Sequence, residues 1–309
     1  MQARHSFNFA LQGKDMNAVE KRRSFAARVR QRELSIAPGV FDMISLRVAD
    51  RQGHSALYMT GYGTVASHLG LPDAGLAGYS ELCDRARVMA AAASTPLIAD
   101  ADTGFGGLLN VARTVRGYED AGVAAIQIED QEFPKKCGHT QGRKVIPTRE
   151  MVRKIEVACE TRRDPDFLIV ARTDARTGLG LDEAICRALA YRAAGADAIF
   201  IEAPESESEF VHIAAAVDAP LLANMVEGGR SPLLSAARLR ELGYAIAIYP
   251  GCGFLAATAA LEATYRYLFE TGSTVDLDVP LYPITEMHRL MGFEEVWAFD
   301  RRWVEEGPK

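Results

Sequence analysis

Short apolar runs recur along the chain, and longer amphipathic segments separate them. The runs lie at Ile36–Val40, Ala56–Met59, Leu97–Asp100, Ala125–Glu129, Phe167–Arg172, Ala198–Glu202, Pro220–Asn224 and Ala245–Tyr249. Nearly continuous apolar runs are typical of strands in a parallel sheet that is covered by helices. The intervening segments have apolar residues at helical spacing, and several end in glycine just before the next run. The pattern therefore predicts alternating strands and helices.

Eight strand–helix units predict a (β/α)8 TIM barrel that forms one α/β domain over residues 1–309. A dinucleotide-binding fold would need G-x-G-x-x-G after the first strand, where the chain reads APGVFDMIS. Residues 1 to about 20 are predicted to form a polar extension, and helices are predicted from about 254 to 309. Apolar residues at helical spacing between Ile284 and Trp303 suggest that this tail packs on another surface, such as a second subunit.

The composition argues against several classes of partner. The net charge of −6 provides no basic surface for nucleic acid or anionic membranes. No stretch approaches the roughly 18 apolar residues of a membrane span, and the N-terminus lacks the apolar segment of a signal peptide. Five cysteines without a CxxC pair argue against a disulfide framework or structural zinc. We therefore expect a cytoplasmic protein with no nucleic-acid or membrane partner.

Polar side chains stand at the ends of six predicted strands. They are Thr60, Asp100, Glu129, Arg172, Glu202 and Asn224. The carboxyl ends of barrel strands meet at one rim, and active sites of this fold are built there. One such residue alone could be a turn former or a helix cap. The whole ring predicts an active site.

Carboxylates in this ring suggest a metal site. Asp100 and Asp102 share one side of an extended segment, and Glu129 is expected across the rim. Mg²⁺ takes one or two protein carboxylates and completes its shell with water and substrate. A helix-capping turn is the alternative for the Asp-Ala-Asp sequence. Arg172 could bind a substrate carboxylate in a bidentate manner, or could instead pair with Asp174.

A long basic segment, EFPKKCGHTQGRKVIP, follows the fourth strand and contains Cys137. Lys135, Lys136 and His139 lie close to it in sequence, and nearby cations stabilise a thiolate. Such a thiol can protonate a carbanion as a general acid, or it can act as a nucleophile. The alternative is an exposed basic loop with an incidental cysteine.

These residues stand in motifs that resemble the isocitrate lyase/phosphoenolpyruvate mutase superfamily. The motifs are MTGYGTVASHLGLPD, LIADADTGFGG, IQIEDQEFPKKCGH, IVARTDAR, FIEAPES and ANMVEGGRSP, within residues 35 to 255 or so. The resemblance implies a Mg²⁺-dependent (β/α)8 barrel, able to take Mn²⁺ instead, that acts on small 2-oxo or 2-hydroxy acids. It also implies a homotetramer built from helix-swapped dimers.

The resemblance also implies roles for individual residues. A substrate carboxylate would be held by the backbone amides of Thr60, Gly61 and Tyr62, and substrate would also contact Arg172, Glu202 and Asn224. The metal would bind Asp100 and Asp102, with Asp73 and Glu129 as outer or water-mediated partners. Cys137 would be the general acid on a gating loop, accompanied by Gly138 and His139.

Two departures from the superfamily narrow the substrate. The 2-methylisocitrate lyases carry arginines where this chain has Leu255 and Ile284. A tricarboxylate needs such cations, because an unpaired buried charge costs several kcal/mol. The departures favour a dicarboxylate, such as 2,3-dimethylmalate or another alkylated malate, over 2-methylisocitrate. The KKCGH sequence favours carbon–carbon cleavage over the phosphonate chemistry of other branches.

The expected reaction is a retro-aldol cleavage that releases a 2-oxo acid and a carboxylic acid. Cys137 would protonate the departing fragment, and Tyr58 and a metal-bound water are both candidates for the base. An oxaloacetate hydrolase or decarboxylase and a phosphonopyruvate enzyme of the same superfamily are the alternatives. A non-enzymatic binding barrel is disfavoured, because the expected residues such as Asp100, Cys137 and Arg172 are all present.

Overall fold

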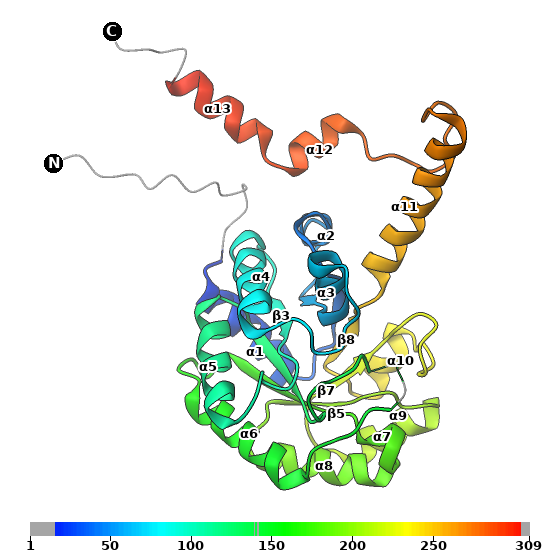
Figure 1. Cartoon of the computed structure of the whole chain (residues 1–309). Coiled ribbons are helices and arrows are strands. Elements are labelled where there is room, and N and C mark those ends of the chain that lie inside the picture. The colour runs from blue at the N-terminus through cyan, green and yellow to red at the C-terminus, as the bar shows by residue number, and fades with distance from the viewer. Residues whose placement is uncertain (1–15, 139, 141, 304–309) are drawn as a thin grey trace, which may run out of the picture. The chain divides into compact units, whose positions relative to one another are not determined.

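The strands close into an eight-stranded parallel barrel (Figure 1). The computed structural model describes residues 16–138, 140 and 142–303. The strands are β1 (Ser35–Val40), β2 (Leu57–Met59), β3 (Leu97–Asp100), β4 (Ala125–Glu129), β5 (Leu168–Thr173), β6 (Ala198–Ile201), β7 (Leu221–Asn224) and β8 (Ile246–Tyr249). Each strand pairs with its sequence neighbours, and β8 pairs with β1. The predicted TIM barrel is confirmed, with every strand end within one residue of its prediction.

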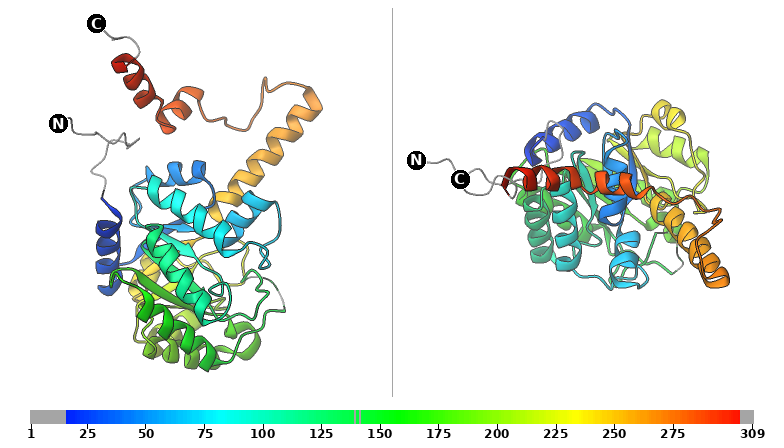
Figure 2. Two further views of the ribbon diagram at one scale, coloured as in Figure 1. Left: turned by 60° about the vertical axis from the view of Figure 1, so that its left-hand side comes forward. Right: turned by 90° about the horizontal axis from the view of Figure 1, so that it is seen from above.

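Helices within residues 16–256 surround the barrel strands, as two further views show (Figure 2). The helices are α1 (Ala18–Arg30), α2 (Met43–Asp50), α3 (Gly61–Leu69), α4 (Tyr79–Ala92), α5 (Leu108–Asp120), α6 (Thr148–Thr161), α7 (Ala175–Leu179), α8 (Leu181–Ala193), α9 (Glu207–Ala216), α10 (Ala236–Glu241), α11 (Cys252–Thr271), α12 (Ile284–Leu290) and α13 (Phe293–Trp303). None of the helices described is both long and apolar enough to cross a membrane.

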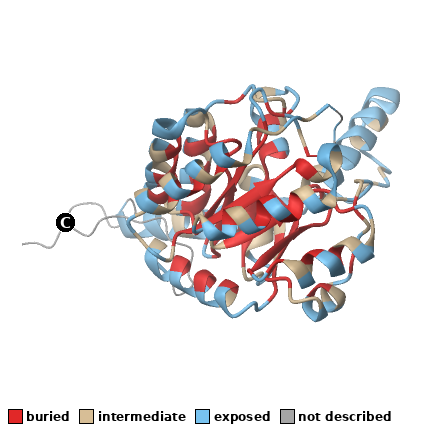
Figure 3. Cartoon of the chain, turned by 90° about the horizontal axis from the view of Figure 1, so that it is seen from below, coloured by how far each residue is buried: buried red, intermediate tan, exposed pale blue. Residues whose placement is uncertain are grey.

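Two apolar layers hold the barrel together. One layer fills the space between the strands and the surrounding helices, and the other fills the barrel interior. Figure 3 shows buried strands at the centre and helices whose outer faces are exposed. Side chains of neighbouring residues in a strand point to opposite sides, so both layers draw on the same strands. This explains why the strands appear in the sequence as continuous apolar runs.

Helix α1 covers the amino-terminal end of the barrel. Its Phe25 is fully buried in the interior layer, together with Ala56, Ala124 and Ala245, each of which directly precedes a strand. Their small side chains leave room for the phenyl ring. Asn17 begins the helix by accepting hydrogen bonds from the backbone N–H groups of Val19 and Glu20. With this end covered, the opposite end is the one that can admit a ligand.

The last helices belong to a second compact unit. Residues 16–256 form the barrel unit, and residues 257–303 are the described part of the other. The tail predicted as helical between Ile284 and Trp303 contains two helices, because Met291 and Gly292 interrupt it and Gly292 adopts a φ of +83°. Many large apolar side chains of this unit are exposed, among them Leu261, Tyr265, Phe269, Phe293, Trp297 and Trp303.

Candidate active site

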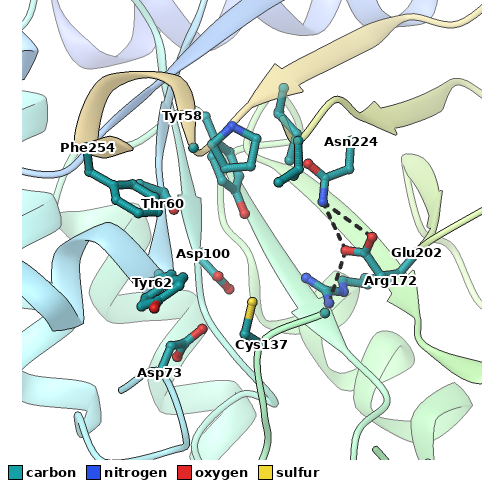
Figure 4. Close-up of a pocket in the computed structure, with 16 residues that line it drawn as sticks. Tyr58, Thr60, Tyr62, Asp73, Asp100, Cys137, Arg172, Glu202, Asn224 and Phe254 are labelled. Carbon is teal, nitrogen blue, oxygen red and sulfur yellow. Dashed lines mark hydrogen bonds and ion pairs between the residues drawn. The ribbon is translucent and has the colours of Figure 1, made fainter. Parts of the chain in front are cut away.

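A pocket opens at the carboxyl ends of the strands (Figure 4). Its polar lining comprises Tyr58, Thr60, Asp73, Asp100, Cys137, Arg172, Glu202 and Asn224. Its apolar lining comprises Tyr62, Val226, Ile248, Pro250 and Phe254, and Gly61, Gly138 and Gly251 complete the wall. The structure thus brings most of the predicted site residues to one pocket. Asp102 and Glu129 are not among the lining residues and stand directly beside those that are.

Arg172 is the central cation of the pocket. Its Nε and Nη2 donate to the two oxygens of Asp174, each at 2.9 Å. The guanidinium also lies 3.3 Å from Glu129 Oε2 and 3.1 Å from Glu202 Oε2. Strand register explains the first of these contacts, because Glu129 of β4 is paired with Arg172 of β5. Arg172 therefore pairs with Asp174 and lines the pocket at the same time.

Asn224 fixes the other side of Glu202. Its side-chain nitrogen donates to both oxygens of that carboxylate, at 3.3 and 3.1 Å. Figure 4 shows the amide, the carboxylate and Arg172 following one another along one wall. Side chains from β5, from the end of β6 and from β7 are thereby held in one orientation, as a preorganised binding site requires.

Asp130 and Arg143 support Arg172 through Asp174, and the sequence reasoning assigned neither of them a role. Arg143, from the segment after β4, forms an ion pair with Asp174. Asp130 accepts the backbone N–H of Asp174 at 2.9 Å and the Thr173 hydroxyl at 2.7 Å. A second acid directly after a strand-end polar residue, as in the IED and RTD sequences, is the signal that could have indicated this layer.

Four carboxylates meet beside the pocket around one ammonium group. Lys135 Nζ lies 2.5 Å from Asp73 Oδ1 and 2.6 Å from Asp102 Oδ1, and the charges of Asp100 and Glu129 also act on it. Burial raises the pKa of Asp102 to about 7, despite the opposing charge of Lys135. Burial also raises the pKa of Asp100 and, more strongly, that of Glu129. Burial thus favours the protonated form of these acids, and the charge of Lys135 opposes that effect.

The cluster has the chemistry of a site for a hard divalent cation. Asp73 and Asp100 line the pocket, and Glu129 Oε1 is buried without a hydrogen-bond partner in the described part of the chain. Within that same part, no three Asp, Glu, His or Cys side chains are arranged as a complete metal-binding group. Mg²⁺ needs only one or two protein carboxylates and otherwise keeps water and substrate. The residues present therefore fit such an ion.

The segment after β4 carries Cys137 into the pocket. The backbone N–H of Cys137 donates to the carbonyl of Asp73 at 3.1 Å. The Gln131 side chain donates to the Lys136 carbonyl and accepts its backbone N–H, at 2.8 and 2.9 Å. Lys135, which we expected to stabilise the Cys137 thiolate, has its ammonium on Asp73 and Asp102 instead. His139 lies outside the described residues.

The end of β2 forms the opposite wall. Gly61 opens α3 directly against the Asp100 carboxylate, since a Cβ atom there would lie 2.5 Å from Asp100 Oδ2. Thr60 is the N-cap residue of α3, so the free backbone N–H groups of the first helical turn lie next to the pocket. Tyr62 packs against Phe254 with ring centroids 5.3 Å apart.

Tyr58 is buried on the floor of the pocket. Its hydroxyl donates to Gln127 Oε1 at 3.2 Å. Burial and the nearby charge of Asp100 raise the pKa of Tyr58 well above its ordinary value. At neutral pH this phenol is therefore a hydrogen-bond donor.

Comparison with known proteins identifies the family of this chain. A family model described as phosphoenolpyruvate phosphomutase matches residues 25–269. The chain belongs to the phosphoenolpyruvate mutase/isocitrate lyase superfamily. The family resemblance seen in the sequence motifs is thereby confirmed.

Several members of this superfamily are similar over nearly their whole length. A 2,3-dimethylmalate lyase of Eubacterium barkeri is 49% identical, with 94% of this chain and 99% of that protein covered. A 2-methylisocitrate lyase of Aeropyrum pernix is 45% identical, with 86% of each chain covered. The structure of an oxaloacetate acetylhydrolase with 3,3-difluorooxalacetate has a TM-score of 0.87 at 36% identity and covers 93% of this chain and 98% of its own. A phosphonopyruvate hydrolase in complex with oxalate and Mg²⁺ has a TM-score of 0.83 at 30% identity, covering 94% and 100%.

Proposed function

We propose that this protein is a Mg²⁺-dependent lyase that cleaves a carbon–carbon bond of a small 2-hydroxy-dicarboxylate. The favoured substrate is 2,3-dimethylmalate or a related alkylated malate, and the products are a 2-oxo acid and a carboxylic acid. One observation carries the proposal: a thiol, an arginine and carboxylates share a single pocket whose remaining wall is apolar. Similarity to a 2,3-dimethylmalate lyase supports the same substrate class.

The two halves of the pocket support an alkylated dicarboxylate. Arg172 and the backbone N–H groups at the start of α3 are suited to bind carboxylates. Val226, Ile248 and Phe254 offer contacts to alkyl groups. Arg172 is the cation among the described residues that line the pocket, so a third carboxylate on the apolar side would be unpaired there, which disfavours 2-methylisocitrate. Leu255 is consistent with this view, whereas Ile284 lies in the second unit and stays untested as a substrate contact.

We assign Mg²⁺, or Mn²⁺ in its place, to Asp100 and Asp73, because both line the pocket. Asp102, which the sequence motifs suggested as a metal ligand, does not line the pocket and contacts Lys135, so we assign it with Glu129 as an outer partner. Such an ion, when bound, stabilises negative charge that develops on a substrate oxygen. Gly61 leaves the space that keeps Asp100 accessible to the pocket. If the assignment is right, Asp100→Ala will abolish metal-dependent activity, and EDTA will abolish the activity of the unaltered protein. Full activity in EDTA would contradict the assignment.

The proton transfers follow from the positions of Tyr58, Glu129 and Cys137. The C2 hydroxyl gives up its proton while the C2–C3 bond breaks, and the bonding electrons remain on the C3 fragment. Tyr58 is a poor base because its pKa is raised, so we assign it a hydrogen bond to substrate. We assign the hydroxyl proton to the carboxylate cluster through Glu129, whose Oε1 is buried without a hydrogen-bond partner in the described part of the chain and whose Oε2 lies 3.3 Å from Arg172. The Cys137 thiol then protonates the C3 fragment and leaves a thiolate.

A substrate panel tests this proposal directly. Purified protein with Mg²⁺ is incubated with 2,3-dimethylmalate, 2-methylisocitrate, oxaloacetate or phosphonopyruvate, and the products are identified. We expect the highest kcat/KM for 2,3-dimethylmalate, with release of pyruvate and propionate. If the main activity is instead cleavage of oxaloacetate to oxalate and acetate, the hydrolase alternative is favoured. Similarity to the oxaloacetate acetylhydrolase structure supports testing this alternative.

Cys137→Ser tests the general acid. Serine preserves the size of the side chain but not its acidity, so kcat is expected to fall by about 10²- to 10⁴-fold. Mn²⁺ affinity should remain unchanged in the same variant, because the thiol is not assigned to the metal. An unaltered kcat would remove Cys137 from this role.

A further inference from the structure

Lys135 is a buried cation that the proposed reaction does not use. Only 3% of its side chain is exposed, and its ammonium group contacts carboxylate oxygens of Asp73 and Asp102. The two acids come from different parts of the chain, since Asp73 lies between α3 and α4 and Asp102 follows β3. Lys135 itself precedes Cys137 by two residues. One side chain thus connects three segments at the carboxylate cluster.

The position of this ammonium group has a consequence for the metal site. Asp73 contacts Lys135 and also lines the pocket, and the backbone N–H of Asp102 donates to Asp100 Oδ1 at 3.0 Å. Any cation bound at Asp100 and Asp73 therefore shares the Asp73 carboxylate with Lys135, whose charge also acts on Asp100. Like charges within a few ångströms repel strongly where water is excluded. Lys135 must therefore weaken the binding of a second cation in its present position.

We propose that Lys135 is a tethered counter-ion that occupies the carboxylate cluster in the metal-free protein and competes with the divalent cation for it. The inference rests on the metal assignment of the proposed function. Without a metal, the lysine limits the repulsion among four buried acids. When a divalent cation binds, it takes over this role, and the lysine becomes dispensable for charge balance. The cost of displacing Lys135 from its carboxylates is then part of the apparent metal affinity.

A purely structural ion pair would behave differently. If Lys135 only held Asp73 and Asp102 in place, its removal would disorder the carboxylates and weaken metal binding. If Lys135 competes, its removal leaves the same oxygens with no cation and strengthens metal binding. The sign of the change in affinity therefore separates the two roles.

The experiment measures Mn²⁺ binding to the full-length protein without substrate, by isothermal titration calorimetry and by the electron paramagnetic resonance signal of free Mn²⁺. Lys135→Met removes the charge and keeps the length of the side chain. We expect its Kd for Mn²⁺ to be at least about tenfold lower than that of the unaltered protein. Lys135→Arg, which keeps the charge, should show no such gain. Lys136→Met is the matched control, because Lys136 is exposed and its ammonium group lies 3.5 Å from the Gly142 carbonyl.

If Lys135→Met is too unstable for titration without metal, the effect of Mn²⁺ on its Tm provides a second measurement. A ligand that binds only the folded state raises Tm, and the gain increases with affinity. Mn²⁺ should therefore raise the Tm of Lys135→Met by more than it raises the Tm of the unaltered protein or of Lys136→Met. An equal or smaller gain, or an unchanged or higher Kd, would overturn the proposal.

These outcomes are distinct from a failure of the proposed function. If neither the unaltered protein nor Lys135→Met binds Mn²⁺, the metal assignment and this inference both fall. If Mn²⁺ binds and Lys135→Met gains no affinity, only the competition is wrong. A different preferred substrate in the panel would leave both results unaffected, because no substrate is present in the binding experiment.

Discussion

Asp174 is the residue on which the arginines of the site converge. It accepts two hydrogen bonds from Arg172 of β5 and forms an ion pair with Arg143 of the segment after β4. The opposing charges of these arginines overcome burial and lower the pKa of Asp174, so the carboxylate stays ionised. From the sequence alone, Arg172 was expected either to pair with Asp174 or to bind substrate. A guanidinium has five N–H donors in a fixed plane, so it can serve both partners.

Gly138, which directly follows Cys137, lies against this ion-pair network. A Cβ atom there would lie 2.7 Å from Glu202 Oε2 and closer still to Arg172. Gly138→Ala should therefore push Cys137 away from substrate, and a displacement of about 1 Å can cost roughly 100-fold in rate. We expect kcat/KM to fall by about that factor while Tm changes little.

Gly178→Ala is the control for this substitution. Gly178 lies in α7, where nothing stands within 4 Å of an added Cβ atom. Its kcat/KM should stay within about twofold of the unaltered value. Equal activity of the two variants would show that the close approach at Gly138 is unimportant for turnover.

At the scale of secondary structure, the pattern of apolar and polar residues predicted those elements whose bounds depend on local sequence. The strand from Ala125 to Glu129 is buried on both faces because one face packs in the barrel and the other under helices, and its predicted ends are correct. The break at Gly292 was missed, because apolar spacing continues across it. The partners of Lys135 were also missed: sequence proximity suggested Cys137, whereas the fold brings Asp73 and Asp102 to it. Such contacts depend on tertiary structure that local pattern does not encode.

Hydrogen bonds between the end of α2 and the residues before β3 allow a test of how the free energy of unfolding depends on pH. Asp50, at the end of α2, accepts the backbone N–H groups of Ser94 and Thr95, each at 2.9 Å. Burial would raise the pKa of Asp50, but these hydrogen bonds outweigh burial and lower it. A carboxylate with a lowered folded-state pKa stabilises the fold above its unfolded pKa of about 3.9, and this stabilisation is lost as the pH falls through the folded value.

Asp50→Asn should therefore lower the free energy of unfolding at pH 7 by about 1–2 kcal/mol, because it replaces charge-assisted hydrogen bonds. The difference from the unaltered protein should shrink as the pH falls below about 4, where Asp50 itself becomes neutral. Urea unfolding at several pH values measures it. Asp300→Asn, at an exposed position in α13, is the control. A difference that does not depend on pH would contradict the assignment to charge.

At the scale of the whole molecule, the exposed apolar residues of the second unit indicate a binding surface for another protein chain. Phe269 is 90% exposed, and Trp297 and Trp303 are 47% and 59% exposed. Apolar surface of this kind marks interaction sites in soluble proteins. We propose that a second copy of the chain covers it, as the superfamily resemblance implied for a homotetramer of helix-swapped dimers.

The prediction is a particle of about four times 33.7 kDa in light scattering coupled to gel filtration. Replacing Phe269 and Trp297 with aspartate should yield smaller particles, since charge on an apolar interface costs several kcal/mol. Glu262→Asp, an exposed change on the same helix as Phe269, should leave the mass unaltered. A monomer in the unaltered protein would refute the assembly.

The contacts of Lys135 and Arg143 have an evolutionary implication. Both residues belong to the segment that carries Cys137, and both attach it to acids of the site, Asp73 and Asp102 in one case and Asp174 in the other. The ion pairs that attach this segment are thus made to acids of the site itself. Natural variation that strengthens this attachment would slow turnover, and variation that loosens it would expose a reactive thiol. Adaptation to heat or cold in this lineage should therefore accumulate elsewhere, in the outer helices rather than at the rim.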